Sequence, residues 1–329
     1  MPAKECLGLH ELSGISEFPV SELQTQASAL MFSGIQESTR ATYTAPQKLY
    51  LQFCNSYGLQ PLPAVDDTLI LFATYMFNKG LSYNTCKVYI SAVVSLHTFS
   101  NVTPPNLKNP RFRLIMRSIS LKSQGHNQKS PITFVVLQSI WQTLGNMKQA
   151  NCLKAAISLG FFGGLRGSEY LKTPFNEGPK MTQLTFISDS CLKFTVTKSK
   201  TKPHGFTLPF HCSKHQICAV CCMKTYLLEL GSQKQVSHDD YLFQYDNTQL
   251  SKFRFNSLLK QVMQAVGQDP NRFSTHSLRS GVTTTAAHNK FRDWELKQIG
   301  GWGTNTYTTY IRSNTRNSSR FAQRLTQKR

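Results

Sequence analysis

The sequence predicts a mainly α-helical protein with two domains, the second of which also contains a small antiparallel sheet. Apolar side chains recur at helical spacing over most of the 329 residues, whereas strand-like runs are confined to about 183–210. The segment SQGHNQKSP at 123–131 has no apolar residue before its final proline and is typical of a linker. We therefore expect an acidic N-terminal arm at 1–39, a helical domain at 40–122 and a larger domain at 132–329.

The first domain is expected to be built from four helices. The spacing of apolar residues predicts three of them, over Thr39–Tyr57, Leu69–Phe77 and Ser82–Phe99. Pro46 is expected to bend the first helix or to delay its start, because proline lacks the backbone donor of a helix interior. A short basic helix is expected after Pro104–Pro105, with the positively charged side chains Arg111, Arg113, Arg117 and Lys122.

The second domain is expected to alternate between helices and a short sheet. Helical patterns at 133–145 and 149–163 lead into three strand-like runs, Gln183–Ile187, Leu192–Lys198 and Phe206–Phe210. The letters KTKPHG between the second and third runs predict a turn, so these two runs are expected to form a hairpin. Further helices are expected in five segments: 214–230, 249–266, 276–288, 293–300 and 304–312.

The composition excludes several classes of protein before any motif is considered. There are 37 lysines and arginines against 17 acidic residues, and the resulting net charge of +20 favours nucleic acid as the partner. The longest apolar run, Leu69–Phe77, is too short to span a membrane. The first residues do not resemble a signal peptide, and the nine cysteines are expected to be reduced thiols inside the cell.

Two of the four candidate motifs place positive charge in the first half of the second domain. Arg166 follows a glycine pair and has Glu169 three residues later, so that an acidic neighbour can orient it. Three lysines, Lys198, Lys200 and Lys202, alternate near the tip of the expected hairpin, where alternate side chains of a strand point the same way. A lysine there could enter a DNA groove or protonate a leaving oxygen.

The other two motifs lie near the C-terminus. His276 and Arg279 are three residues apart in an expected helix, so they share a face on which both could bind phosphate oxygens. Trp302 follows a glycine pair, and Tyr307 and Tyr310 come soon after it. Each motif alone also fits an ordinary structural role, such as a surface ion pair, a solvated hairpin tip or core packing.

Taken in order, the four motifs resemble the catalytic set of the tyrosine recombinase (phage integrase-like) family. That set consists of an arginine, a hairpin lysine, His-x-x-Arg, a histidine or tryptophan, and a tyrosine. The segment His276–Arg312 particularly resembles the recombinases of eukaryotic DIRS- and Ngaro-type retrotransposons and of crypton elements, which are mobile elements. It departs from their pattern at Gly301, where arginine is common, and at Ser280, where isoleucine is common.

The resemblance implies a fold and an activity. The first domain would be a SAM-like core-binding domain and the second an α+β catalytic domain with the integrase/recombinase-like fold. The protein would cleave and rejoin double-stranded DNA through a 3′-phosphotyrosyl link, without a metal, ATP or any other cofactor. The implied catalytic residues are Arg166, Lys200, His276, Arg279, Trp302 and the nucleophile Tyr310. A homodimer on one DNA site, a homotetramer in the synapse and a nuclear location are also expected.

Several alternatives stay open at the level of the sequence. Lys198 or Lys202 could replace Lys200, and both are otherwise expected to contact DNA, as are Arg111, Arg113 and Arg117. Tyr307 could replace Tyr310, although packing is its default role. The protein could also be a catalytically inactive, domesticated DNA-binding protein derived from such an enzyme. A type IB topoisomerase would share the covalent chemistry, but the helical first domain favours recombination.

Two further features of the sequence bear on ligand binding. A cysteine-rich run has partial zinc-ligand spacing, but we expect free thiols there and no metal site, because the C-x-x-C pair lacks clear partners; its residues are His211, Cys212, His215, Cys218, Cys221 and Cys222. The C-terminal tail carries a positive charge at every fourth position, at Arg312, Arg316, Arg320, Arg324 and Lys328. Such a stripe is expected either to bind an anion or to be a solvated tail.

Overall fold

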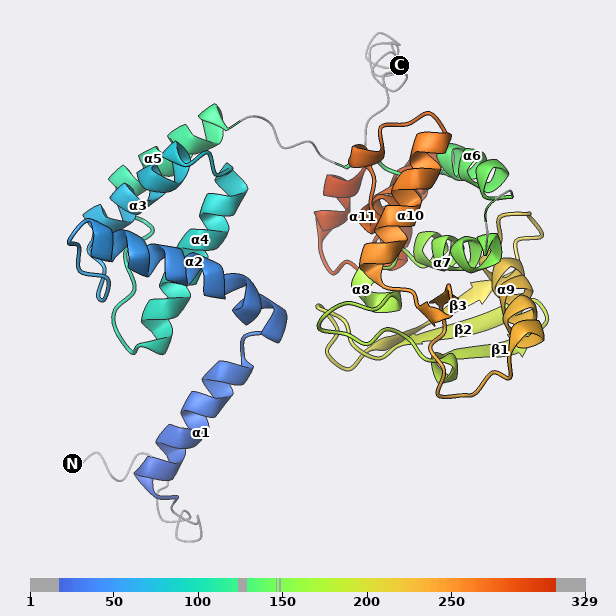
Figure 1. Cartoon of the computed structure of the whole chain (residues 1–329), viewed down its shortest axis with the longest axis horizontal. Coiled ribbons are helices and arrows are strands. Elements are labelled where there is room, and N and C mark those ends of the chain that lie inside the picture. Colours follow the sequence, from blue (N-terminus) through green and yellow to red (C-terminus); the bar gives the residue numbers. More distant parts are fainter. Residues whose placement is uncertain (1–17, 124–128, 146, 148, 312–329) are drawn as a thin grey trace, which may run out of the picture. The chain divides into compact units, whose positions relative to one another are not determined.

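A computed structural model describes residues 18–123, 129–145, 147 and 149–311 (Figure 1). The chain forms two compact units, Met1–His126 and Asn127–Arg329. Each unit has its own hydrophobic core. Both units are mainly helical, and the second contains the antiparallel sheet that the sequence predicts, as expected for the predicted fold class.

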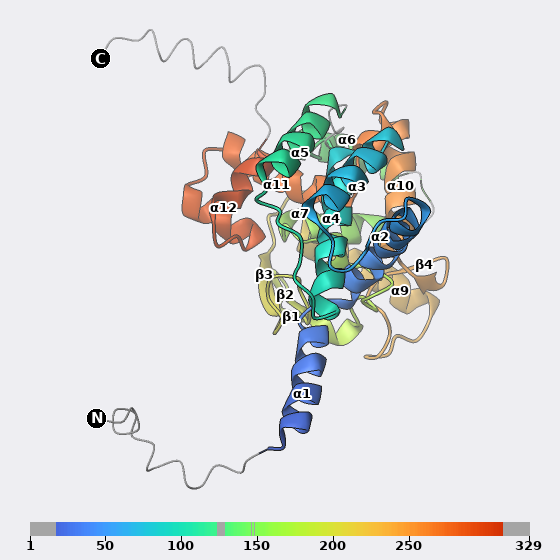
Figure 2. The ribbon, with the colours of Figure 1, turned by 90° about the vertical axis from the view of Figure 1, so that its left-hand side faces the viewer.

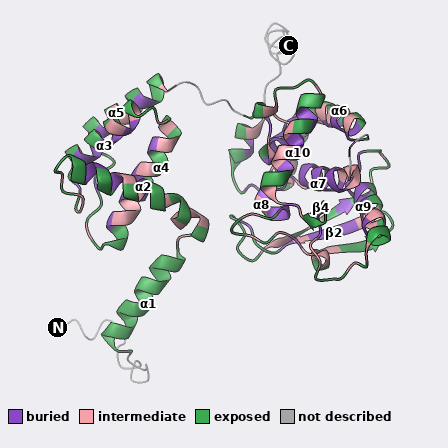
Figure 3. Cartoon of the chain, viewed as in Figure 1, coloured by how far each residue is buried: buried purple, intermediate pink, exposed green. Residues whose placement is uncertain are grey.

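The described residues of unit 1 form five helices, four of which surround one core. They are α1 (Val20–Ser33), α2 (Glu37–Ser56), α3 (Asp66–Asn78), α4 (Tyr83–Phe99) and α5 (Pro110–Lys122). The core is rich in aromatic residues, among them Tyr50, Phe53 and Phe72, whose rings pack edge to face or tilted against one another. Helix α1 lies within the expected acidic arm and buries none of its residues. Figure 3 shows it exposed along its length.

Side-chain caps explain where two of these helices begin. Ser82 accepts a hydrogen bond from the backbone N–H of Thr85 and so caps α4. Asn109 does the same for α5, with Pro110 at the first helical position, where its missing N–H costs nothing. Helix α2 begins at Glu37 and carries Pro46 buried in its interior, so the expectation that Pro46 could delay the start of this helix is wrong.

Unit 2 begins with helices and then forms the sheet. Its first elements are α6 (Phe134–Leu144), α7 (Ala150–Phe162), the short α8 (Gly167–Tyr170) and a 3₁₀ turn at Met181–Gln183. Strands β1 (Leu184–Ser188), β2 (Cys191–Val196) and β3 (Phe206–His211) follow, and then helix α9 (Ala219–Gln233). A short hairpin was not expected from the sequence. Its two strands, β4 (Gln244–Tyr245) and β5 (Thr248–Gln249), have two residues each.

The C-terminal half of unit 2 is helical. It contains α10 (Lys252–Ala265), a 3₁₀ turn at Pro270–Arg272, α11 (Thr275–His288), α12 (Asp293–Gly300) and the 3₁₀ helix η4 (Asn305–Tyr310). The expected α-helix at 304–312 is therefore a 3₁₀ helix over its described part. Helix α7 lies at the centre of the unit and packs against α9 and α11, which explains why most of its residues are buried. None of the helices in the described ranges is long and apolar enough to cross a membrane.

The three-stranded sheet is antiparallel, in the order β1-β2-β3 (Figures 1 and 2). In β2, Leu192, Phe194 and Val196 are buried and alternate with more exposed residues, as period-two geometry requires. Strand β2 ends at Val196, before the three lysines. The expected strand end at Lys198 is therefore wrong. Lys200 and Lys202 lie on the loop that joins β2 to β3, where the turn was expected.

Candidate active site

Arg166 is held at the start of helix α8 by a buried carboxylate. Glu169, which is only 4 % exposed, accepts the backbone N–H of Arg166 at 2.6 Å and its Nη1 at 2.9 Å. The hydroxyl of Ser199 donates to the same carboxylate at 2.7 Å. The arginine itself stays partly exposed. Glu169 thus fixes the guanidinium of Arg166 in place and also ties the β2–β3 loop to helix α8.

Arg279 connects two backbone turns from inside the unit. Its side chain is 2 % exposed, and its guanidinium donates to the carbonyl oxygens of Gly164 and, at 2.7 Å, of Gly300. Gly164 has a φ of +54°, and a Cβ there would lie 2.6 Å from the carbonyl oxygen of Ile299. Only glycine therefore suits this turn, which brings the chain beside Arg166 against the end of α12.

Helix α11 presents His276 and Arg279 differently, although both belong to one face. His276 lies in the first turn and is exposed, whereas Arg279, one turn later, is buried. The close approach of the chain at Ile132 fixes the position of the helix. The backbone N–H of Ile132 donates to the carbonyl oxygen of Ser277 at 2.8 Å, and a Cβ on Gly281 would lie 1.8 Å from the carbonyl oxygen of Ile132.

Three aromatic rings meet at Tyr310, the last residue of η4. The ring centroid of Tyr310 lies 5.1 Å from that of His276 and 5.1 Å from that of Trp302. The guanidinium carbon of Arg279 lies 4.4 Å from the Trp302 ring and 5.8 Å from the Tyr310 ring. The hydroxyl of Thr284 donates to the carbonyl oxygen of Tyr310 at 3.0 Å and ties η4 to α11. Tyr310 itself is half-buried, so its hydroxyl is not sealed inside a core.

Tyr307 occupies a different environment from Tyr310. It is only 4 % exposed and packs against Trp302 and the apolar side chains of α11 and α12. A hydrogen bond with the side chain of Asp293, together with burial, raises the pKa of Tyr307 above its usual value. Because the side chain of Tyr307 is buried and its hydroxyl is paired with Asp293, we interpret Tyr307 as a packing residue.

The two arginines create a site that is short of negative charge. Burial lowers the pKa of Arg279, and the positive charge of Arg166 lowers it further. The Nε of Arg279 is buried and has no hydrogen-bond partner among the described residues. An anion at this position would relieve the repulsion between the two guanidinium groups. A phosphate matches both the charge and the forked geometry of arginine.

The three candidate lysines are all exposed on the β2–β3 loop, and Lys202 approaches the turn at Gly301. Its Nζ lies 4.8 Å from the centre of the Phe206 ring and beside Gly301, where a Cβ would be 3.6 Å away. Neither Lys198 nor Lys200 makes a hydrogen bond or an ion pair within the described part of the chain. Arg166 also donates to Thr201 on this loop, at 3.4 Å.

The structure thus brings five of the six predicted catalytic residues into one connected cluster: Arg166, His276, Arg279, Trp302 and Tyr310. The predicted Lys200 lies on the adjoining loop. The buried supports Ser199 and Thr284 were not found from the sequence. Nothing in the local pattern around Ser199 indicates that it would reach Glu169, because the contact depends on the path of the loop.

The remaining predicted DNA contacts belong to unit 1. Arg111, Arg113 and Arg117 are all exposed on α5. Arg111 forms an ion pair with Asp67 at 2.8 Å, so part of its charge is already balanced. Arg113 and Arg117 are four residues apart and therefore present their charges on the same side of the helix. The basic positions of the C-terminal tail, from Arg312 on, lie outside the described residues.

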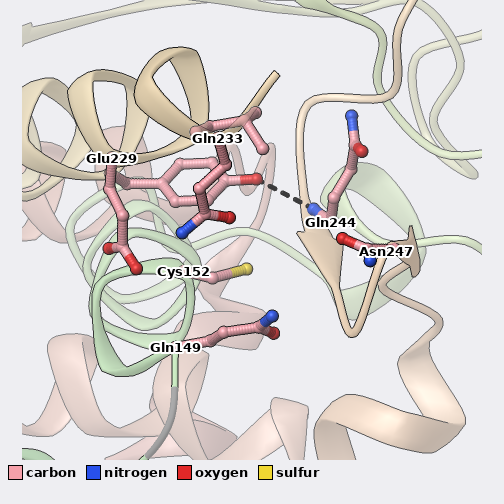
Figure 4. A pocket seen from close by; sticks show the side chains of 8 residues that line it. Gln149, Cys152, Glu229, Gln233, Gln244 and Asn247 are labelled. Atoms are coloured by element: carbon pink, nitrogen blue, oxygen red, sulfur yellow. Dashed lines mark hydrogen bonds between the residues drawn. The ribbon is translucent and has the colours of Figure 1, made fainter.

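Unit 2 also contains two hollows. One is a small cavity of about 20 Å³, lined by Cys152, Tyr226 and Gln244, among others (Figure 4). The Tyr226 hydroxyl accepts the backbone N–H of Gln244 at 2.9 Å. The volume of this cavity suits about one water molecule. A more open hollow of about 260 Å³ lies between β3 and α12, with Phe210 and Trp294 in its wall. Neither hollow includes a predicted catalytic residue.

Comparison with solved structures places the chain in the integrase/recombinase fold. A complex of the site-specific recombinase XerH with its difH substrate has a TM-score of 0.62 at 15 % identity, over 87 % of this chain and 80 % of that one. The Tn1549 transposon integrase bound to transposon right-end DNA also has 0.62 at 15 % identity, over 92 % and 98 %. A λ integrase dimer on a core site has 0.56 at 14 % identity, over 94 % and 85 %. No protein-family model and no curated protein matches the sequence.

Proposed function

We propose that this protein is a tyrosine recombinase, which cleaves and rejoins double-stranded DNA through a 3′-phosphotyrosyl intermediate. The observation that carries the proposal is the contact of the Tyr310 ring with His276, Trp302 and Arg279. Arg166 is close enough to Arg279 for its positive charge to lower the pKa of Arg279. These residues come from four separate segments and match the family's catalytic set in type and order. The fold shared with XerH and the Tn1549 integrase supports the same activity.

In the proposed reaction, the hydroxyl oxygen of Tyr310 attacks the scissile phosphorus. A bond forms between this oxygen and phosphorus, and the bond from phosphorus to the 5′-oxygen breaks. His276, whose ring faces Tyr310, is placed to take the phenolic proton. Arg166 and Arg279 stabilise the charge of the pentacoordinate phosphorane with their donors. Because the phosphotyrosyl link keeps the energy of the broken bond, a 5′-hydroxyl can later reverse the reaction without ATP.

The 5′-oxygen leaves as an alcohol only if it receives a proton. We assign this role to Lys200, which best fits the family's hairpin pattern, with Lys198 and Lys202 as the alternatives. Lys202 has structural support of its own, because its Nζ lies beside Gly301, the residue that precedes Trp302 in the chain. The indole N–H of Trp302 can donate a hydrogen bond but does not transfer its proton at neutral pH. The acid must therefore be a lysine or His276.

We also propose that the substrate is held mainly through its phosphates. The net charge of +20 and the exposed arginines of α5 support this mode of binding. The XerH and Tn1549 structures contain DNA, and the λ integrase structure contains a dimer on a core site. By analogy we propose that two copies of this protein bind one DNA site and that four copies form the synapse of two DNA sites. A nuclear location and an origin in DIRS-, Ngaro- or crypton-type mobile elements are proposed from the sequence alone.

Covalent trapping tests the proposed function. Purified full-length protein is incubated with a pool of end-labelled duplexes, each nicked so that the released fragment diffuses away and the covalent complex cannot reverse. We expect a labelled protein band on a denaturing gel, lost in Tyr310→Phe and kept in Tyr307→Phe. The second variant is a matched control, because it removes the same atom three residues away.

Two results would contradict the proposal. A band that survives in Tyr310→Phe and disappears in Tyr307→Phe would move the nucleophile to Tyr307. The absence of any band, with tight and salt-sensitive binding to the same duplexes, would favour the non-catalytic, domesticated DNA-binding protein.

A further inference from the structure

Three cysteines of unit 2 lie together, and none of them belongs to the proposed active site. Cys212 follows strand β3, and Cys218 and Cys221 belong to the N-terminal end of helix α9. The ligand atoms of these three residues all lie within 4.8 Å of one another. In the described ranges this is the one group of three or more histidine, cysteine or acidic side chains with such a spacing.

The spacing of the sulfur atoms matches that of thiolates around a single metal ion. Zinc binds thiolate sulfur at about 2.3 Å in a tetrahedral arrangement, which places two sulfur ligands about 3.8 Å apart. The Sγ atoms of Cys212 and Cys218 are 3.8 Å apart, and those of Cys212 and Cys221 are 3.5 Å apart. Very little movement would therefore bring the three sulfurs onto one zinc ion.

The backbone around the cluster is also arranged to hold thiolates. Cys218 is the N-cap residue of α9 and Cys221 lies in its first turn. The free N–H groups and the dipole of a helix N-terminus favour negative sulfur at these positions. On the other side, the backbone N–H of Cys212 donates to the carbonyl oxygen of Ser190 at 2.7 Å, which fixes Cys212 against the β1–β2 turn. Three thiolates at one point repel one another unless a cation lies between them.

A disulfide accounts for the arrangement less well. A disulfide joins two sulfurs at about 2.0 Å and leaves the third cysteine without a role. Here Cys212 is in contact with both of the other cysteines, and all three are free thiols in the structure. Cys222, next in sequence to Cys221, points elsewhere and lies 4.0 Å from the carbonyl oxygen of Gln216. The cluster therefore selects three of the four local cysteines.

We propose that Cys212, Cys218 and Cys221 form a three-thiolate site for a zinc ion. The fourth position is taken by water, because Cys221 is exposed and the histidines of the same run, His211 and His215, are outside the cluster. Zinc in this site clamps the end of β3 to the start of α9. None of the proposed catalytic residues belongs to it.

Cobalt substitution tests the proposal on the full-length protein, without DNA. Metal is removed from the protein with a chelator under reducing conditions, and Co²⁺ is then titrated in. Tetrahedral Co²⁺ with thiolate ligands gives strong visible d–d bands and a near-ultraviolet charge-transfer band. We expect saturation at one Co²⁺ per chain and loss of both bands when one equivalent of Zn²⁺ is added.

Single variants link the bands to the cluster. Cys221 is the exposed cysteine of the cluster, so Cys221→Ser should disturb the fold least of the three possible cysteine variants. The charge-transfer band of this variant should fall by about a third or be lost. Cys218→Ser should behave in the same way. Cys191→Ser, in strand β2, is the matched control and should retain the full spectrum.

Three results would overturn the proposal. The first is no tetrahedral spectrum in reduced protein whose thiols react quantitatively with a thiol reagent. The second is a spectrum that persists unchanged in both Cys221→Ser and Cys218→Ser. The third is a Cys212–Cys221 disulfide, found by peptide mass mapping in protein purified with a reductant. None of these measurements involves DNA cleavage, so the zinc site and the proposed function can fail separately.

Discussion

The ring of Tyr310 lies 5.1 Å, centroid to centroid, from the ring of His276. The tyrosine comes from the last 3₁₀ helix of the described chain and the histidine from the first turn of α11. The bond from Thr284 to the backbone of Tyr310 holds the two elements together. The guanidinium carbon of Arg279 lies 5.8 Å from the centre of the same tyrosine ring. These contacts are the geometric basis of the proposed reaction.

The buried carboxylate of Glu169 is predicted to support both stability and catalysis. In Glu169→Gln, one carboxylate oxygen becomes an NH₂ group that faces a donor, either the backbone N–H of Arg166 or the donors from Arg166 and Ser199. We expect the free energy of unfolding to fall by about 1–3 kcal/mol in denaturant titrations. The yield of the covalent complex should fall as well, because Arg166 loses its anchor.

The control for this variant is Glu177→Gln, which removes the same charge at an exposed position. We expect its unfolding free energy to stay within about 0.5 kcal/mol of the wild type. Equal losses in the two variants would mean that Glu169 has no special role in positioning Arg166.

Gly281 is predicted to be required for the position of helix α11. A Cβ at this residue would lie 1.8 Å from the carbonyl oxygen of Ile132, so the helix or the 131–133 segment must move in Gly281→Ala. We expect a loss of about 1–3 kcal/mol in unfolding free energy, typical of overpacking. Gly231→Ala in α9 has open space around the added Cβ and should be neutral or stabilising by up to about 1 kcal/mol. If the unfolding free energy fell in both variants, or rose in both, the close packing of Gly281 against Ile132 would be contradicted.

The hydrogen bond between Tyr307 and Asp293 predicts a pH dependence of stability at alkaline pH. The pKa of Tyr307 is raised in the folded protein, first by this hydrogen bond and then by burial. The stabilisation is therefore fully present below the ordinary tyrosine pKa of about 10, and it is lost as the pH rises through the higher folded value. Unfolding titrations between neutral pH and about pH 11 should show a decline that is smaller in Tyr307→Phe. An identical decline in the variant would exclude the effect.

The arginines of α5 are predicted to differ in their contribution to DNA binding. Arg117 has an exposed side chain, whereas Arg111 is paired with Asp67. If Arg117 contacts one phosphate, Arg117→Gln should reduce the slope of log affinity against log salt by about 0.9. Arg111→Gln should reduce it by less, because Asp67 already balances part of its charge. Binding measured at several salt concentrations gives both slopes, and a larger change in Arg111→Gln would contradict this order.

Much of the fold could be predicted from the sequence because its signals are local. Strand β3 was expected at Phe206–Phe210 and is found at Phe206–His211, since alternation and a glycine turn mark it clearly. The error at residues 304–312 has a different origin. Side-chain spacing does not separate an α-helix from a 3₁₀ helix over six residues, and the packing of Trp302 and Tyr307 decides the outcome.

The candidate site was predictable in part for a similar reason. The order of Arg166, His276, Arg279, Trp302 and Tyr310 along the chain is visible in the sequence. Their supports depend on contacts between distant segments, which no local pattern encodes. The same holds for Cys212, which is six residues from Cys218 in sequence and acquires its role from the way β3 leads into α9.

The most direct test of the central claim is to identify the residue that carries the DNA. The covalent complex is digested with a protease and a nuclease, and the nucleotide-bearing peptide is mapped by mass spectrometry. The account predicts a nucleotide joined through its 3′-phosphate to Tyr310, with a 5′-hydroxyl on the released fragment. A nucleotide on Tyr307 or another side chain, or a link through a 5′-phosphate, would contradict it.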